Sequence, residues 1–393
     1  MNYQESLDYL FSLIRSGIKL GLENTAHLLR HFGDPQLAVS TIHIAGTNGK
    51  GSTAAFTESI LRASGHRVGL YTSPHLVDFR ERIQVNRVPI AEDEFASLVG
   101  RVKQAADSKN IPVTFFEFGT VLAFLYFSEK KLDWNVIEVG LGGRLDATNF
   151  CQAPISILTS ISKDHENYLG HDLEKITFEK ASIIKEGGTV FADIPNEVVS
   201  KVISRVAQER HATLKRLRKD FNAERASFNS QTQLIHFRGQ QREWRNLKLP
   251  LIGQHQVSNA ALAVAACLQL NSEQISISEE HVRQGLQSTI WSGRLETVAQ
   301  DPTIVLDCAH NPDGVKSLTT SLKEYFQFEQ CLLVVGMMKD KSVEEMLDLF
   351  VQFAQKIILV KPRQARSEDP NRLYTLLSKN NKFVEIINEL PYA

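Results

Sequence analysis

The sequence predicts an α/β protein in which a large, doubly wound parallel sheet is followed by a second, smaller α/β domain. Short runs of β-branched and aliphatic residues alternate with longer helical patterns along most of the chain, which is typical of parallel strands joined by crossover helices. The runs are apolar at consecutive positions, as expected of strands buried on both faces. The 393 residues are enough for more than one domain of ordinary size.

The elements of the large domain follow from local patterns. Strands are expected where a short aliphatic run leads into a turn or a helical pattern, at residues 41–44, 67–72, 135–139, 155–161 and 189–192. Helices are expected where apolar positions recur with helical spacing, at residues 1–20, 52–64, 120–128 and in an alanine-rich stretch from near Asn259. Residues 211–249 alternate polar and apolar side chains, which predicts a small antiparallel excursion.

The alternation of strands and helices restarts after residue 296. Strands are expected at residues 303–306, 331–335 and 356–360, with helices between them. We therefore predict two domains, at residues 1–297 and 298–393.

Composition and charge narrow the class of protein. The 44 basic and 45 acidic residues nearly cancel and 42% of residues are hydrophobic, which argues against a disordered chain and against strong overall attraction to nucleic acid. The four cysteines form no CxxC pair, so a reducing compartment is the simplest home. Glu5 and Asp8 do not fit a signal peptide, and the apolar stretch 260–268 is too short to cross a bilayer. We expect a cytoplasmic protein without nucleic-acid or membrane partners.

Residues 45–52 (AGTNGKGS) form the strongest single motif. They lie between a predicted strand and a predicted helix, where glycines turn backbone N–H groups toward phosphate oxygens, Lys50 adds a positive charge and the Ser52 hydroxyl can reach a magnesium ion. The motif predicts an ATP site, although Gly51 separates Lys50 from Ser52 and departs from the strict GxxxxGK[ST] pattern. The alternative is a glycine turn with a surface lysine.

Glu138 stands at the end of an apolar strand. Burying a carboxylate there is costly unless a cation or hydrogen bonds compensate, and the carboxyl end of a parallel strand is where open α/β sheets bind ligands. We interpret Glu138 as a magnesium ligand, with a hydrogen-bonded core glutamate as the alternative. By themselves, His165 is more typical of a surface loop and Lys180 of an exposed helix face.

Taken together, the motifs resemble the folylpolyglutamate synthase and dihydrofolate synthase family, within the Mur ligase superfamily. The matching blocks occur in the family's order: residues 17–24 (GIKLGLEN), 42–52 (IHIAGTNGKGS), 72–83 (TSPHLVDFRERI), 138–149 (EVGLGGRLDATN), 164–165 (DH), 169–170 (LG), 179–181 (EKA), 253–256 (GQHQ), 291–294 (WSGR), 307–312 (DCAHNP) and 340–341 (DK).

The resemblance implies a two-domain enzyme with ATP between a large domain that carries the phosphate loop and a small Rossmann-like domain. The implied reaction is amide ligation. A carboxylate of the folate attacks the ATP γ-phosphate to give an acyl phosphate and ADP, and the amine of glutamate then displaces phosphate. Dihydropteroate is a possible second acceptor, because the motifs do not separate one activity from two. A monomer is expected.

The resemblance also implies roles for individual residues. The implied magnesium ligands, for two ions, are Ser52, Ser73, Glu138 and His165, and Lys180 matches the family's carbamylated lysine. The implied nucleotide contacts are Thr47, Asn48, Gly49, Lys50, Gly51, Ser52, Asn259, Arg294 and Asp307. Lys50, Lys180 and His310 are the implied catalytic residues, and Phe116, Glu117 and Asp146 match regions that contact the pterin-bearing substrate or, alternatively, serve ordinary packing.

Two other functions remain open at this point. A Mur ligase acting on a UDP-muramoyl precursor would share the phosphate loop and the HNP block, but the blocks at 17–24, 72–83 and 138–149 favour folate. A nucleotide-binding switch would need neither Lys180 nor Asp307 and His310. The family's C-terminal domain usually continues into a further strand, so we expect the small domain to lack an edge strand.

Overall fold

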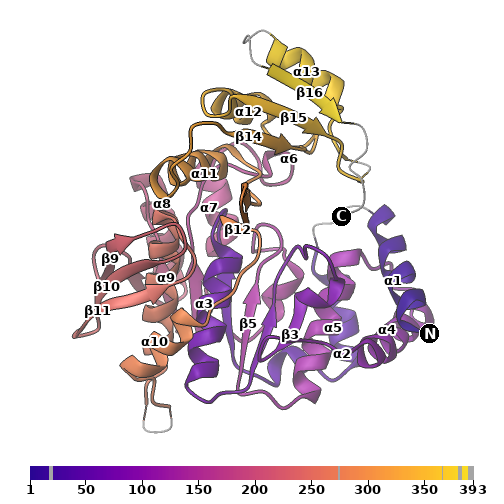
Figure 1. The fold of residues 1–393 in the computed structure, drawn as a ribbon. Helices are drawn as coiled ribbons and strands as arrows, with labels where there is room; N and C mark the ends of the chain where they lie inside the picture. Colours follow the sequence, from indigo (N-terminus) through magenta and orange to yellow (C-terminus); the bar gives the residue numbers. More distant parts are fainter. Residues whose placement is uncertain (17–20, 273–274, 365, 379–382, 388–393) are drawn as a thin grey trace.

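A computed structural model describes residues 1–16, 21–272, 275–364, 366–378 and 383–387. The predicted fold class is confirmed: a large domain built on a mostly parallel sheet carries a separate smaller domain, which lies beyond one end of the sheet (Figure 1). None of the described helices is long and apolar enough to cross a membrane.

The central strand of the large sheet is β1 (Thr41–Ala45), which pairs in parallel with β5 (Trp134–Glu138) and β6 (Ile155–Leu158). The full order is β4 (Val88–Pro89), β3 (Ile83–Val85), β2 (Val68–Tyr71), β5, β1, β6, β7 (Thr189–Ala192) and β8 (Thr213–Arg216). The pairings of β2 with β3 and of β3 with β4 are antiparallel, and the other pairings are parallel. The carboxyl ends of β1, β5 and β6 therefore meet at one edge, where such sheets bind ligands.

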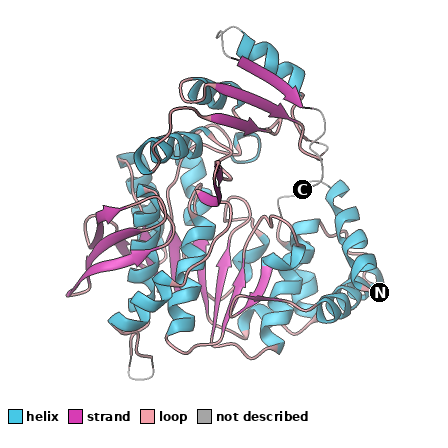
Figure 2. Cartoon of the chain, viewed as in Figure 1, coloured by secondary structure: helices cyan, strands magenta, loops and turns pink. Residues whose placement is uncertain are grey.

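Helices cover both faces of this sheet (Figure 2). Ile42 and Ile44 of β1 pack in the core formed with α3 (Lys50–Ala63), α9 (Gln254–Leu268) and α10 (Glu279–Gln287). The other face, which includes Ile137 of β5, is covered by α1 (Tyr3–Ser12), α2 (Glu23–His31), α4 (Glu92–Ser108) and α5 (Phe115–Glu129). A third core lies between β6, β7, α7 (Leu173–Ala181) and α8 (Glu197–Glu209), with the short α6 (Glu166–Leu169) before α7.

Three expectations about the elements need correction. Residues 211–249 are not wholly an antiparallel excursion, because β8 joins the edge of the parallel sheet and only β9 (Phe221–Phe228), β10 (Gln233–Gly239) and β11 (Arg242–Leu249) form the antiparallel unit. α9 starts at Gln254 and not near Asn259; its first turn is polar and does not show the alanine-rich pattern that marks the rest of the helix. The N-terminal helix ends at Ser12 and a 3-10 turn, Leu13–Ser16, follows; residues 17–20 lie outside the described part of the chain.

The small domain contains two separate groups of strands. β12 (Glu296–Gln300) and β13 (Thr303–Leu306) form an antiparallel pair, and β14 (Leu332–Val335), β15 (Lys356–Val360) and β16 (Phe383–Ile387) form a parallel sheet. α11 (Pro312–Tyr325), α12 (Val343–Val351) and α13 (Pro370–Leu377) pack with it around a core that includes Met346, Ile357 and Leu373. The expected absence of a final edge strand concerns residues beyond Ile387, which lie outside the described residues.

Candidate active site

The phosphate loop runs from the end of β1 to the start of α3, and three of its glycines have no room for a side chain. A Cβ on Gly46 would lie 1.8 Å from Oγ1 of Thr159. Gly49, the N-cap of α3, has a φ of 87°, and a Cβ there would lie 2.4 Å from Oδ1 of Asn259. A Cβ on Gly51 would lie 2.9 Å from the ring of Trp291. The close approach of Trp291 therefore accounts for the extra glycine between Lys50 and Ser52, which departs from the strict motif.

Lys50 bends back over its own loop. Its Nζ donates to the carbonyl oxygens of Gly46 at 3.2 Å and Thr47 at 3.1 Å. Burial lowers the pKa of Lys50, while the negative charges of Glu138 and Asp164 oppose the shift. The ammonium group thus lies among the loop carbonyls next to the N-terminus of α3, where the oxygens of a phosphate would be stabilised.

Glu138 is the last residue of β5, and its side chain is buried. Its Oε2 accepts the backbone N–H of Ser73 at 3.0 Å. Burial raises the pKa of Glu138, and the positive charge of Lys50 partly offsets that effect. The structure therefore brings together Lys50, Ser73 and Glu138, as the sequence predicts.

The Ser52 hydroxyl is tied to α9 by a glutamine that the sequence analysis did not single out. Nε2 of Gln256 donates to Oγ of Ser52 at 3.2 Å, and Oε1 of the same amide accepts from Nδ2 of Asn259 at 3.0 Å. Gln256 belongs to the block at 253–256, which was the available signal. This chain places Ser52 and Asn259 on the same side of the phosphate loop.

Lys180 is buried in the last turn of α7, contrary to its default assignment to an exposed helix face. Its Nζ donates to the carbonyl of Gly46 at 2.9 Å. Burial, and secondly the positive charge of Lys50, lower the pKa of Lys180 to about 7. A substantial fraction of the side chain is therefore the uncharged amine near neutral pH.

His165 and its neighbour Asp164 lie where the two domains meet. His165 is the N-cap of α6, with a φ of 54°, and burial lowers its pKa to about 4. Asp164 accepts Nζ of Lys341 at 2.8 Å and Nδ2 of Asn311 at 3.0 Å, both from the small domain. These contacts bring the small domain to the carboxyl end of the central strands.

A second contact between the domains joins two amides. Nδ2 of Asn311 donates to Oδ1 of Asn48 at 2.9 Å, and Nδ2 of Asn48 donates to Oδ1 of Asn311 at 3.2 Å. His310 precedes Asn311; its Nδ1 contacts the carbonyl of Cys308 at 2.9 Å and its Nε2 lies 3.7 Å from Oδ2 of Asp164. The imidazole of His310 therefore lies next to the Asp164 carboxylate, at the contact between the domains.

Asp307 and Arg294 lie where the chain enters the small domain. Oδ2 of Asp307 accepts the N–H of Leu295 at 3.0 Å, and Oδ1 accepts the N–H of Ala309 at 2.8 Å. Beyond the larger effect of burial, the positive charge of Arg294 acts to lower the pKa values of Lys50, Glu138 and Asp307. Arg294 therefore lies near these three residues, in the region between the domains. The predicted nucleotide contacts therefore gather around the phosphate loop and this connection.

The three predicted substrate residues have structural partners of their own. The ring of Phe116 packs on Gly140, where a Cβ would lie 2.3 Å from the ring. Oε2 of Glu117 accepts the N–H of Thr114 at 2.8 Å, which completes a capping box at the start of α5. The carboxylate of Asp146 accepts backbone N–H groups of the loop after β5. Each of the three side chains thus has a structural role, and their contacts with substrate stay predictions.

The predicted metal ligands carry donor atoms that suit magnesium. Ser52, Ser73 and Glu138 offer oxygen atoms, which Mg²⁺ prefers, and the raised pKa of buried Glu138 is what a nearby cation would reverse. Within the described ranges, no group of three or more His, Cys, Asp or Glu side chains is arranged to hold a metal ion. The predicted set contains two residues of those types, Glu138 and His165, and fits magnesium through its hydroxyl and carboxylate oxygens.

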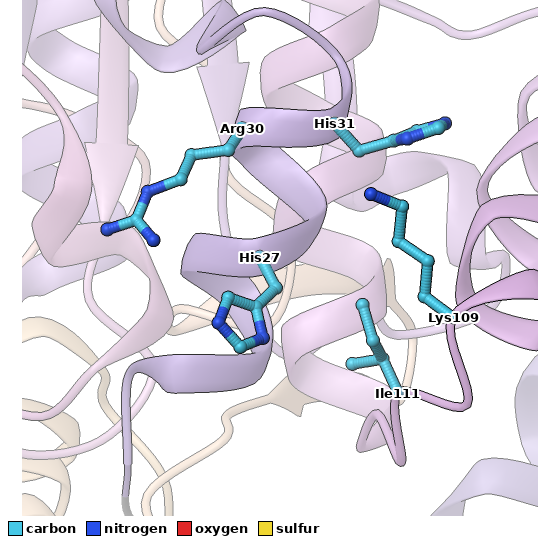
Figure 3. A pocket seen from close by; sticks show the side chains of 5 residues that line it. All are labelled: His27, Arg30, His31, Lys109 and Ile111. Atoms are coloured by element: carbon cyan, nitrogen blue, oxygen red, sulfur yellow. The ribbon is translucent and has the colours of Figure 1, made fainter.

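A cavity of about 340 Å³ lies elsewhere, between α2 and the segment that follows α4 (Figure 3). It is lined by His27, Arg30, His31, Lys109 and Ile111. It contains none of the predicted site residues.

Models of known protein families match most of the chain. The Mur ligase middle domain matches residues 44–267, and the Mur ligase glutamate ligase domain matches residues 293–392. The dihydrofolate synthase/folylpolyglutamate synthase of Bacillus subtilis (strain 168) is 37% identical over 393 residues, covering 97% of this chain and 90% of that protein. The chain belongs to the dihydrofolate synthase/folylpolyglutamate synthase family. The predicted resemblance is therefore confirmed.

Solved structures of this family have the same fold. A Mycobacterium tuberculosis folylpolyglutamate synthase complexed with ADP superposes with a TM-score of 0.92 at 28% identity, covering 98% of this chain and 89% of that chain. A folylpolyglutamate synthase complex with AMPPCP and folate has a TM-score of 0.86 at 32% identity, covering 99% of this chain and 97% of that chain.

Proposed function

We propose that this chain is an ATP-dependent ligase that adds L-glutamate to a folate and accepts dihydropteroate as a second substrate. The observation that carries the proposal is the relationship to dihydrofolate synthase/folylpolyglutamate synthase over nearly the whole chain. The half-buried Lys50 and the buried Glu138 and Lys180 at the end of the central strands support the chemistry. ATP is the nucleotide, as expected for a relative of proteins solved with ADP and AMPPCP.

The reaction has two steps. The carboxylate of the acceptor attacks the γ-phosphorus of ATP, which forms an acyl phosphate and releases ADP. The amine of glutamate then attacks the acyl carbon, loses a proton and expels inorganic phosphate, which leaves an amide. Such transfers depend mainly on positioning and on neutralising oxygen charge, which Lys50 and the N–H groups at the start of α3 provide.

We propose that Ser52, Ser73, Glu138 and His165 hold two magnesium ions. When bound, Mg²⁺ would neutralise charge on the phosphate oxygens. Glu138 presents its carboxylate beside the phosphate loop, where the N–H of Ser73 orients it. The low pKa of His165 keeps its ring neutral, and a neutral ring is the form that ligates metals.

Lys180 is proposed to be carbamylated. The uncharged amine attacks CO₂, a nitrogen–carbon bond forms and a proton leaves, so that a cation becomes an anion. The pKa of about 7 supports this step because the free amine is available near neutral pH. The anion would lie beside Gly46 and could help hold the second magnesium ion.

A reducing compartment fits the four free cysteines, none of which forms a disulfide. We therefore propose that the enzyme works in the cytoplasm. We also propose that it is a monomer, which is the simplest arrangement. The folate-directed relatives favour this function over cell-wall ligation.

The test supplies purified protein with ATP, Mg²⁺, glutamate and either tetrahydrofolate or dihydropteroate, and follows phosphate release. We expect release with tetrahydrofolate and with dihydropteroate. Release with only one of them would restrict the enzyme to that activity. Phosphate release with a UDP-muramoyl acceptor and with neither folate compound would instead assign the protein to cell-wall ligation. Lys50→Met serves as the inactive reference, and Lys109→Met, in the distant cavity, as the matched active control.

A further inference from the structure

A buried polar chain links the central strand to the loop after β5. His43 lies in the middle of β1, and its side chain is fully buried. Its Nε2 lies 2.8 Å from Oγ1 of Thr148, which in turn hydrogen-bonds Oδ1 of Asp146. This chain of hydrogen bonds joins residues that are far apart in the sequence, since His43 and Thr148 are separated by 105 positions.

The direction of these hydrogen bonds follows from the chemistry of the groups. An ionised carboxylate only accepts, so the Thr148 hydroxyl donates to Asp146 and must accept from His43. His43 is therefore the neutral tautomer with its proton on Nε2. Among the described residues, Nδ1 of His43 is buried without a hydrogen-bond partner. The ring is thus held by one donated hydrogen bond, and its Nδ1 makes no hydrogen bond to the described residues.

Asp146 uses both oxygens to shape the loop. Oδ1 also accepts the N–H of Thr148 at 2.9 Å, and Oδ2 accepts the N–H groups of Gly140 at 3.1 Å and Leu141 at 2.9 Å. These four donors fill the acceptor positions of a carboxylate. Asp146 therefore fixes the path of the chain directly after Glu138.

The same loop forms one wall of the candidate site. Phe116 packs on Gly140, and the N–H of Arg144 donates to the carbonyl of Glu179 at 2.8 Å, one residue before Lys180. The phosphate loop also contacts α7, through Lys180 and Gly46, but it has a further anchor on the side of β6, where Oγ1 of Thr159 donates to the carbonyl of Asn48 at 2.7 Å. Movement of the wall would thus disturb the acceptor side more than the nucleotide side.

We propose that His43 and Thr148 are positioning residues for the acceptor. His43 orients the Thr148 hydroxyl, the hydroxyl orients Asp146, and Asp146 holds the loop of residues 140–148 against Phe116 and α7. The proposal rests on the proposed function for the identity of the acceptor.

The test compares apolar and conservative replacements of similar shape. Thr148→Val removes the hydroxyl, Thr148→Ser keeps it, His43→Leu removes the donor and His43→Gln offers an amide N–H in its place. We expect Thr148→Val and His43→Leu to raise KM for tetrahydrofolate or dihydropteroate about tenfold, as for a lost hydrogen bond to a charged group. KM for ATP should stay within about twofold, and Thr148→Ser and His43→Gln should restore most of the acceptor affinity.

The double variant distinguishes a connected chain of hydrogen bonds from two contacts that act independently. Thr148→Val and His43→Leu together should cost no more than the larger single effect, because either change breaks the same chain. Equal increases of KM for ATP and acceptor, or loss of thermal stability with an unchanged acceptor KM, would overturn the positioning role.

A second measurement does not depend on activity. Nitrogen-15 histidine NMR, with His43→Gln to assign the signal, should show the Nε2–H tautomer in the wild type and a shifted Nε2–H resonance in Thr148→Val. An Nδ1–H tautomer would overturn the inference even in an active enzyme. Failure of the proposed function would appear differently, as wild-type protein with the Nε2–H tautomer but no acceptor-dependent phosphate release.

Discussion

Two lysines, the half-buried Lys50 and the buried Lys180, share one backbone carbonyl at the phosphate loop. Nζ of Lys50 and Nζ of Lys180 both donate to the oxygen of Gly46, at 3.2 and 2.9 Å. Burial already disfavours the charged forms, and two ammonium groups in such a place also repel each other. The pKa of about 7 at Lys180 follows from this arrangement, and a lysine on an exposed helix face would not have it.

Replacing Lys180 by methionine separates stability from catalysis. Because the folded-state pKa of about 7 lies below the unfolded value of about 10.4, the unfolded chain binds more protons between these values. The stability of the wild type relative to Lys180→Met should therefore fall as pH is lowered from about 10 to about 7, and level off below. Urea unfolding across this pH range measures it.

Turnover of Lys180→Met should be at least about tenfold below wild type, with ATP affinity nearly unchanged. Lys175→Met, on an exposed position of the same helix, is the matched control and should behave as wild type. An unaffected rate in Lys180→Met would rule out the carbamate.

Glu138 gives the second test at this scale. Glu138→Gln keeps the shape and the acceptor for the N–H of Ser73 but removes the charge. We expect turnover that depends on magnesium to fall about 100-fold or more, because a charged ligand at the phosphates acts mainly on the transition state. Initial rates over a magnesium titration measure the effect; a near-normal rate would make Glu138 a structural core glutamate.

At the scale of secondary-structure elements, the packing of α10 against α3 can be tested at one glycine. Gly285 of α10 lies so close to α3 that a Cβ would be 2.5 Å from Cα of Ile60 and 2.8 Å from its nitrogen. Backbone atoms cannot move aside as a flexible side chain can. The two helices therefore depend on a glycine at this crossing, although glycine weakens a helix.

Gly285→Ala should lower the free energy of unfolding by about 1–3 kcal/mol, as overpacked cores do. The matched control is Gly100→Ala in α4, where no atom lies within 4 Å of the added Cβ. That change should raise stability by about 0.5–1 kcal/mol through helix propensity. Urea unfolding of both variants measures the difference, and similar values for both would contradict the close approach of α10 and α3.

A buried ion pair and an amide pair are two of the contacts that join the two domains; further hydrogen bonds join Arg225 of β9 to Glu324 and Tyr325 of α11. Lys341 and Asp164 are each less than one-tenth exposed and lie 2.8 Å apart, and this contact helps to keep the pKa of Asp164 well below its usual range against the opposing effect of burial. Asn48 and Asn311 make the second contact. Both contacts lie beside the candidate site.

Lys341→Met should loosen the contact between the domains, because it leaves the Asp164 carboxylate without its cation. We expect a lower melting temperature and a larger radius of gyration by small-angle X-ray scattering. Lys341→Met combined with Asp164→Asn removes the stranded charge and should recover part of the melting temperature. An unchanged radius of gyration in the single variant would contradict a role in holding the domains together.

The sequence alone was sufficient for the fold class, the phosphate loop and the family. These depend on local patterns: an apolar run followed by glycines and a helix is legible within about 20 residues. The helix starts were less accurate, as at Gln254, and the domain division near residue 298 stays a prediction. Trp291 against Gly51 explains the irregular phosphate loop only after folding, because 240 residues separate them.

Tertiary structure decided which candidate residues are buried together. It placed Lys180 against Gly46, joined Asp164 to Lys341 and connected His43 through Thr148 to Asp146. No spacing rule relates these residues, because the fold brings together segments that are far apart in the sequence. The first two pairs meet at the carboxyl ends of the parallel strands, whereas His43 meets Thr148 beside the middle of β1. Burial and nearby charge, which set the pKa values of the site, are properties of that arrangement and cannot be assigned to any single segment of the chain.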